Sequence, residues 1–149
     1  MVISHLNTTR ILDVVRFIEE CVAELRPFSE MTEETFLADR ENPPFVESYL
    51  RRGLEAVFDV GRHILAKTAG FREIEYKAIA QELGRKEIIS KELAEVLYKM
   101  AGYGNRMVHF YREVTPRELY QIVTGNLGDI ERFNREIVVF IKAYEEKRR

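Results

Sequence analysis

The chain has 149 residues, of which 46% are hydrophobic and 32% charged, the length and composition of one soluble globular domain. Its 23 Lys and Arg against 25 Asp and Glu leave a net charge of −2, so a nucleic-acid site must be local rather than an overall basic surface. A single cysteine, Cys21, excludes an internal disulfide and fits a reducing cytoplasm. Because the sequence has no signal-peptide pattern and no apolar run long enough to span a membrane, we expect a cytoplasmic protein without membrane association.

Hydrophobic residues recur at helical spacing from the start of the chain. Residues 8–25 predict an amphipathic helix that buries Cys21. We expect this helix to end before Pro27, because the residue preceding a proline disfavours the helical conformation. A short helix is predicted within residues 31–39, with Thr32 as its N-cap.

A long helix is expected over residues 43–67, since Pro44 suits a first helical turn and the apolar spacing continues. Gly53 and Gly61 lie inside this helix, where glycine lowers helix stability, and they predict close approach of neighbouring helices. The side chains that we expect this helix to place in the core are Phe45, Tyr49, Leu50, Leu54, Val57, Phe58, Ile64 and Leu65.

The second half of the chain is helical as well. A short helix over residues 76–83 is predicted to stop at Gly84, and the next begins at Ser90, a good N-cap. Thr115, followed by proline and by glutamate at the third helical position, predicts a capping box at the start of the last helical region. No stretch alternates with the period of a strand. We therefore expect an all-α, up-and-down antiparallel bundle of four to six helices, in one domain spanning residues 1–149.

The stretch AGYGNRMVHFY, residues 101–111, concentrates polar and aromatic side chains. If it is helical, Asn105 and Arg106 share a face with His109, and Tyr111 extends the same polar edge. The side chains expected to pack inward are Met107, Val108 and Phe110. Histidine transfers protons near neutral pH, and arginine can hold a phosphate. Such a set can cleave RNA without a metal ion; the alternative is a hydrogen-bonded structural histidine.

A second polar row lies on the long helix at four-residue spacing and consists of Arg51, Glu55, Asp59 and His63. It is either a solvated face with ion pairs along the helix, or a source of a carboxylate that orients His109 or holds a partner. The same spacing permits a metal site, but no further ligand is evident, so we expect neither a metal nor a cofactor.

These residues resemble those of the HepT-like proteins of the HEPN superfamily, small helical toxin ribonucleases of bacteria and archaea. The resemblance covers most of the chain, including RRGLEAVFDVGRHILA with its Glu, Asp and His, and it is most specific in ELAEVLYKMAGYGNRMVHFYREVTPRELYQIV. The family motif reads Arg, four residues, His, any residue, Tyr. It places His109 as the catalytic histidine, Tyr111 as the terminal tyrosine and Asn105 as the asparagine after the arginine.

Gly104 stands at the position of the motif's catalytic arginine and is the departure from the family pattern. Arg106 could take over the charge, although two residues along a helix correspond to a rotation of about 200°. Alternatively, the protein is a naturally silenced member, or the glycine is an attenuating substitution. The last two alternatives predict weak or absent ribonuclease activity.

The resemblance also implies partners. HepT-like proteins form homodimers whose two motifs face each other across a cleft, and their antitoxin MntA, a minimal nucleotidyltransferase, neutralises them by attaching AMP to the motif tyrosine, here Tyr111. The residues we expect to act in RNA cleavage are His109, Arg106, Asn105 and Asp59. Those expected to contact RNA or the partner are Tyr111, Glu55, His63 and Arg112. The alternative function is a catalytically inactive binding module that engages, and is AMPylated by, a nucleotidyltransferase antitoxin.

Overall fold

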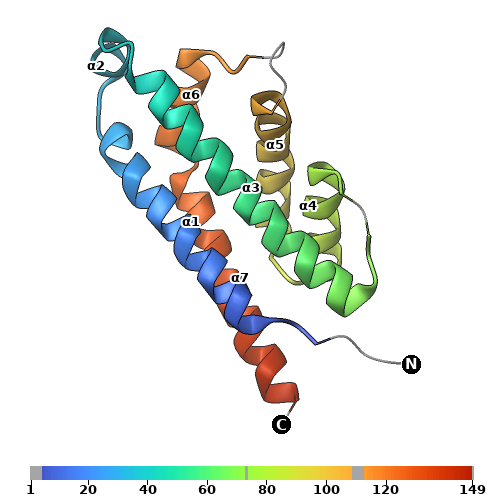
Figure 1. Ribbon diagram of the computed structural model, residues 1–149. Helices are drawn as coiled ribbons and strands as arrows, with labels where there is room; N and C mark the ends of the chain where they lie inside the picture. The colour runs from blue at the N-terminus through green and yellow to red at the C-terminus, as the bar shows by residue number, and fades with distance from the viewer. Residues whose placement is uncertain (1–4, 73, 109–112, 149) are drawn as a thin grey trace.

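The computed structural model describes residues 5–72, 74–108 and 113–148, and this part of the chain forms seven helices and no strand. The helices are α1 (Thr8–Ser29), α2 (Glu33–Ala38), α3 (Asn42–Ala69), α4 (Tyr76–Arg85), α5 (Lys91–Met107), α6 (Pro116–Gly125) and α7 (Leu127–Lys147). The long helices α1, α3, α5 and α7 alternate in direction (Figure 1). The expected all-α antiparallel bundle is confirmed. The expected number of helices is too low, because the last helical region is divided at Asn126 into α6 and α7.

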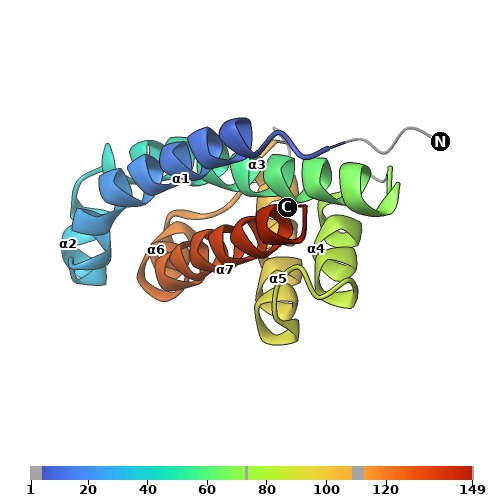
Figure 2. The ribbon, with the colours of Figure 1, turned by 90° about the horizontal axis from the view of Figure 1, so that it is seen from below.

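The helices pack in two layers (Figure 2). α1 lies antiparallel to α3 in one layer, α7 packs under α1, and α4 and α5 pack on each other and against α3. The short helices α2 and α6 contact each other at the end of the bundle opposite the start of α1 and the end of α7 (Figure 1). The last turn of α5 points to the same end, so the polar stretch begins far from both chain termini.

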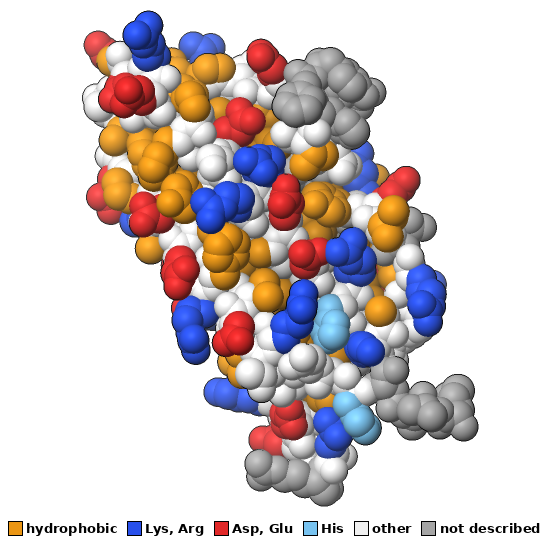
Figure 3. Space-filling view, in the orientation of Figure 1, with side chains coloured by type: hydrophobic (Ala, Val, Ile, Leu, Met, Phe, Trp, Pro, Cys, Tyr) orange, Lys and Arg blue, Asp and Glu red, His pale blue; other side chains and the backbone are white. Residues whose placement is uncertain are grey.

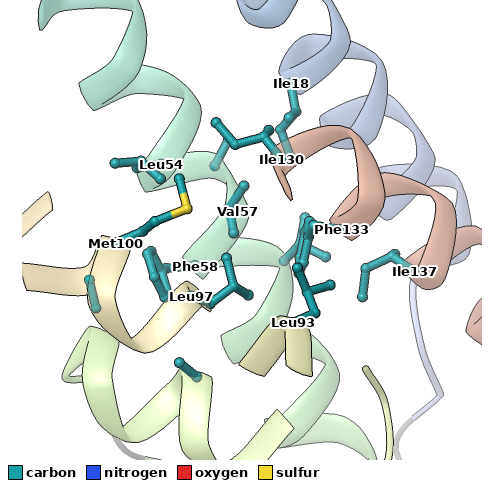
Figure 4. Close-up of a cluster of buried hydrophobic side chains, with 14 of the residues drawn as sticks. Ile18, Leu54, Val57, Phe58, Leu93, Leu97, Met100, Ile130, Phe133 and Ile137 are labelled. Carbon is teal, nitrogen blue, oxygen red and sulfur yellow. The ribbon is translucent and has the colours of Figure 1, made fainter. Parts of the chain in front are cut away.

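Buried hydrophobic side chains from all seven helices form one cluster. Figure 4 shows its centre, where Ile18 of α1, Phe58 of α3, Leu97 of α5 and Phe133 of α7 converge. Burial of this apolar surface is the main contribution to the stability of the bundle. The expected core positions of α3 are largely confirmed, but Phe45 is wrong: it is 39% exposed and packs at the surface of the first turn, with its ring centroid 5.3 Å from that of Phe28.

Two expected helix ends are wrong. α1 continues past Pro27 to Ser29, because a proline near the end of a helix removes few backbone hydrogen bonds. The Ser29 hydroxyl also donates to the Arg26 carbonyl at 2.6 Å and so satisfies one of the last acceptors. Gly84 lies inside α4 rather than after it, and the helix ends at Arg85.

Buried small residues allow α4 to pack closely on its neighbours. A Cβ atom at Gly84 would lie 2.6 Å from the Cβ of Ala94 on α5, and one at Gly61 would lie 2.8 Å from Cδ1 of Leu83. The expected role of Gly61 in close helix approach is therefore confirmed. At Gly53 a Cβ would make only an ordinary 3.5 Å contact with Cys21.

Candidate functional site

The first part of the polar stretch, residues 101–107, forms about the last two turns of α5. The helix ends at Met107, with Val108 as its C-cap, so the helical spacing expected for this stretch is confirmed over residues 101–107. Met107 packs against the core, whereas Val108 is 45% exposed because it follows the end of the helix, and its expected burial is wrong. The expected site residues that lie outside the described part of the chain are His109, Tyr111 and Arg112, together with Phe110.

Gly104 is buried where α5 passes α4. A Cβ at this position would lie 3.2 Å from Cδ2 and 3.3 Å from Cε2 of Tyr76, and 4.0 Å from Cδ1 of Leu54. Tyr76 begins α4, and its ring stacks on that of Phe58 in α3, with the centroids 4.3 Å apart and the planes at 8°. Position 104 therefore faces the ring of Tyr76 and the side chain of Leu54, where α3, α4 and α5 meet.

Tyr76 also connects position 104 to the polar row of α3. Burial raises the pKa of the Tyr76 phenol, and the neighbouring carboxylates of Glu55 and Asp59 raise it further, whereas Arg62 lowers it. The phenol thus lies in the field of these α3 side chains while its ring covers Gly104. Sequence reasoning missed Tyr76, because one aromatic residue at the start of an amphipathic helix is indistinguishable from a core residue.

The polar row of α3 consists largely of charges paired within the helix. Arg51 Nη1 lies 3.7 Å from Glu55 Oε1, and Asp59 forms an ion pair with Arg62. Such pairs on an exposed helix face contribute only about 0.2–0.5 kcal/mol each. The ion pairs agree with the interpretation of this row as a solvated face. The Asp59 side chain nevertheless remains 60% exposed near Tyr76.

His63 lies at the far end of the same row. Its Nε2 accepts a hydrogen bond from the backbone N–H of Asn7 at 3.4 Å. Burial lowers the pKa of the imidazole, and the nearby cations of Lys67 and Arg10 lower it further, so the neutral form is favoured. The two ends of the row therefore lie in different surroundings. Glu55 and Asp59 lie near the Tyr76 phenol, whereas His63 contacts Asn7, the residue that precedes α1.

Arg106 reaches from the last turn of α5 to the first turn of α6. Its Nη1 donates to Glu118 Oε2 at 2.6 Å, and its Nη2 donates to Glu118 Oε1 at 2.8 Å and to the Glu113 carbonyl at 2.7 Å. This is a bidentate, charge-assisted contact of the strongest kind that side chains form. The guanidinium is thus directed away from Gly104 and towards α6, which does not favour Arg106 as a replacement for the motif arginine.

Glu118 has two tasks, of which sequence reasoning anticipated one. The expected capping box is present: the Glu118 N–H donates to Thr115 Oγ1 at 3.2 Å, and Glu118 Oε1 accepts from the Thr115 N–H at 3.1 Å. The same carboxylate holds Arg106. Hydrogen bonds from Arg106, and then from the Thr115 backbone, lower the pKa of Glu118 to about 2. The second task depends on a contact across 12 residues, which the local sequence pattern does not reveal.

The surface around these residues carries mixed charge. On the face formed by α1 and α3, acidic and basic side chains alternate with hydrophobic ones (Figure 3). Within the described ranges, no group of three or more His, Cys, Asp and Glu is placed to hold a metal ion. None of the helices described here is long and apolar enough to cross a membrane.

The comparisons with known proteins agree with the motif. Residues 18–137 match the family model described as ribonuclease HepT-like, and this range contains both the α3 row and the whole polar stretch. The protein belongs to the HepT-like ribonuclease family. The resemblance to this family that the sequence motif indicated is therefore confirmed.

Relatives of this HepT-like protein span nearly its full length. A curated tRNA nuclease HepT of Aphanizomenon flos-aquae (strain 2012/KM1/D3) is 24% identical over 93% of this chain and 92% of its own. A tri-AMPylated HEPN toxin of Shewanella oneidensis, solved in complex with an MNT antitoxin, superposes with a TM-score of 0.77 at 24% identity, over 87% of this chain and 96% of that one. The cytosolic protein of unknown function YutE from Bacillus subtilis gives 0.80 at 16% identity, over 93% of both chains. These structures share the fold.

Proposed function

We propose that this HepT-like protein is a toxin endoribonuclease that cleaves RNA without a metal ion, in a cleft shared by two copies of the chain. The observation that carries the proposal is the family match across residues 18–137, which includes the motif with His109 and Tyr111. In this role His109 exchanges a proton with the 2′-hydroxyl or the leaving oxygen. Asn105 and the accessible Asp59 orient it, and the name of the curated relative suggests tRNA as the first substrate to test.

The proposed activity is impaired because Gly104 removes the motif cation. A cation at this position would stabilise negative charge that develops on the phosphate. Arg106 does not replace it in this proposal, since its guanidinium is engaged by Glu118 and the Glu113 carbonyl. The distances of 3.2 and 3.3 Å to Tyr76 mean that a Cβ at position 104 already requires a shift of a few tenths of an ångström.

The test compares this chain with its Gly104→Arg and Gly104→Gln variants on a tRNA pool in vitro. Both substitutions introduce a long side chain against Tyr76, but only arginine restores the charge. We expect the Gly104→Arg variant to cleave RNA, and the parent chain and Gly104→Gln to cleave little. Adding His109→Ala to the Gly104→Arg variant should abolish its cleavage. Equal inactivity of all three folded proteins, or equal activity of Gly104→Gln and Gly104→Arg, would contradict the catalytic proposal.

A second candidate function is a binding module for a nucleotidyltransferase antitoxin. It is favoured by the lack of a cation at the buried position 104. A protein that does not cleave RNA for this reason still has Tyr111 as a site for modification. The related HEPN toxin, described as AMPylated in complex with an MNT antitoxin, supports this kind of partner. An AMP group on Tyr111 would add bulk and negative charge where RNA phosphate must bind.

This function is tested by incubating the protein with an MntA-like nucleotidyltransferase, ATP and Mg²⁺. The Tyr111 hydroxyl would attack the α-phosphorus of ATP and release pyrophosphate, so intact-mass spectrometry should show the addition of one adenylyl group. Tyr111→Phe should abolish this increase, whereas Tyr103→Phe should not. Modification of both variants to the same extent would remove Tyr111 as the target.

A further inference from the structure

We infer that Arg106 and Glu118 are positioning residues: their ion pair fixes the two ends of the segment that carries His109 and Tyr111. The inference rests on the proposed ribonuclease function and assigns to these residues a role other than contact with RNA. Arg106 lies on the last turn of α5, and Glu118 on the first turn of α6. The segment between the two helices consists of residues 108–115.

The contacts close a short loop of chain. Besides its two bonds to Glu118, Arg106 donates to the carbonyl of Glu113, which follows Arg112 directly in the sequence. One guanidinium therefore holds the chain three residues before His109 and again two residues after Tyr111. In general, a contact that joins the two ends of a short chain segment lowers the conformational entropy of that segment.

The setting of the pair favours a rigid contact over a loose surface one. The Arg106 and Glu118 side chains are only 34% and 27% exposed, and both carboxylate oxygens of Glu118 are bound. By contrast, in the pair between Arg117 and Glu33, also at the start of α6, Arg117 Nε donates to Glu33 Oε1 at 2.8 Å, and the arginine side chain is 70% exposed. The bidentate geometry gives the Arg106 pair directional precision that a single bond lacks.

The two tasks of Glu118 can be separated by substitution. Glu118→Gln retains a residue that suits a capping box but loses the charge that holds the guanidinium. Thr115→Ala does the reverse, since it removes the hydroxyl that caps α6 and leaves the Arg106 pair intact. Arg106→Lys keeps the positive charge and loses the planar fork. Glu33→Gln is the control for loss of a neighbouring ion pair.

The experiment follows the imidazole signals of His5, His63 and His109 by NMR of ¹³C-histidine-labelled full-length protein, with His109 assigned from a His109→Gln spectrum. We expect Glu118→Gln and Arg106→Lys to change the chemical shift and titration of His109 and to leave His5 and His63 unchanged. Thr115→Ala and Glu33→Gln should leave His109 as in the parent chain, even where they lower thermal stability. An unchanged His109 signal in Glu118→Gln, or an equal change in Thr115→Ala, would overturn the inference.

The kinetics of RNA cleavage provide a second test. They are measured in this chain or, if only the Gly104→Arg variant cleaves RNA, in that variant. Small misplacement of a catalytic group can reduce the rate by about 100-fold. We expect Glu118→Gln to lower kcat by about 10- to 100-fold with little change in KM, because a positioning defect affects the reacting geometry more than RNA binding. A change confined to KM would overturn the positioning role. If neither form cleaves RNA, the ribonuclease proposal fails, while the NMR result still decides the structural role of the pair.

Discussion

The absence of a side chain at Gly84 determines how closely α4 and α5 can pack. A Cβ there would lie 2.6 Å from the Cβ of Ala94, a methyl carbon that cannot rotate away, so the two helix backbones would have to separate. The sequence suggested a helix stop at this residue, because a glycine after a helical run commonly follows a helix end. The contact with α5 that explains the glycine is a tertiary one and was not predictable from local pattern.

We predict that Gly84→Ala lowers the free energy of unfolding by about 1–3 kcal/mol, the usual cost of overpacking a core. The matched control is Gly102→Ala, in the same helix pair but with no atom within 4 Å of the added Cβ. It should raise stability by about 0.5–1 kcal/mol, because alanine is the better helix former. Urea denaturation of both variants measures the difference. Equal stability changes would contradict the close-contact explanation.

Tyr76 offers a direct check of the candidate site's geometry. The carboxylates of Glu55 and Asp59 help to raise the pKa of its phenol. Because the neutral phenol is favoured beside negative charge, Glu55→Gln and Asp59→Asn should each lower that pKa towards its ordinary value. Tyrosine ¹³Cζ NMR titration measures the shift, with Asp13→Asn on the surface of α1 as a control. A Tyr76 titration that is the same in all variants would separate the phenol from the α3 row.

At the scale of elements, local chemistry predicted helix starts better than helix ends. Thr32, Ser90 and Thr115 each accept a hydrogen bond from a backbone N–H of the following turn, as expected. These bonds involve residues three apart, so the sequence contains both partners. Helix ends also depend on packing against other helices, which the local sequence does not contain. The end of α1, which runs past Pro27 to Ser29, therefore differs from the predicted one.

The junction of α5 and α6 should contribute stability that depends on pH. The folded-state pKa of Glu118 is depressed from 4.5 to about 2, so its stabilising effect is present above pH 4.5 and is lost as the pH falls towards 2. We therefore expect Glu118→Gln to be less stable than the parent chain at neutral pH and to approach it in this acid range. Denaturant midpoints at several pH values measure the gap. For Glu33→Gln, which affects a more exposed pair, a smaller gap is expected, and an equal one would contradict this account.

At the scale of the whole molecule, the fold was predictable and the site only partly so. Amphipathic periodicity sufficed for an all-α bundle, because each apolar stripe must be covered by another helix. The motif identified the family and marked Gly104 as the departure from its pattern. It did not show that Tyr76 covers position 104, or that Arg106 is bound by Glu118, because both contacts join different helices.

If the cleft is shared by two chains, as proposed above, their association is a condition for activity. We predict a mass about twice the 17.5 kDa of one chain by light scattering at micromolar concentration. In the form that cleaves RNA, the rate per chain should fall as the protein is diluted below the dissociation constant of the dimer, because separated chains lose the second motif of each cleft. Carrier protein in every dilution controls for adsorption to surfaces. A monomeric mass, or a constant rate per chain across the dilution range in which light scattering shows dissociation, would contradict the composite site.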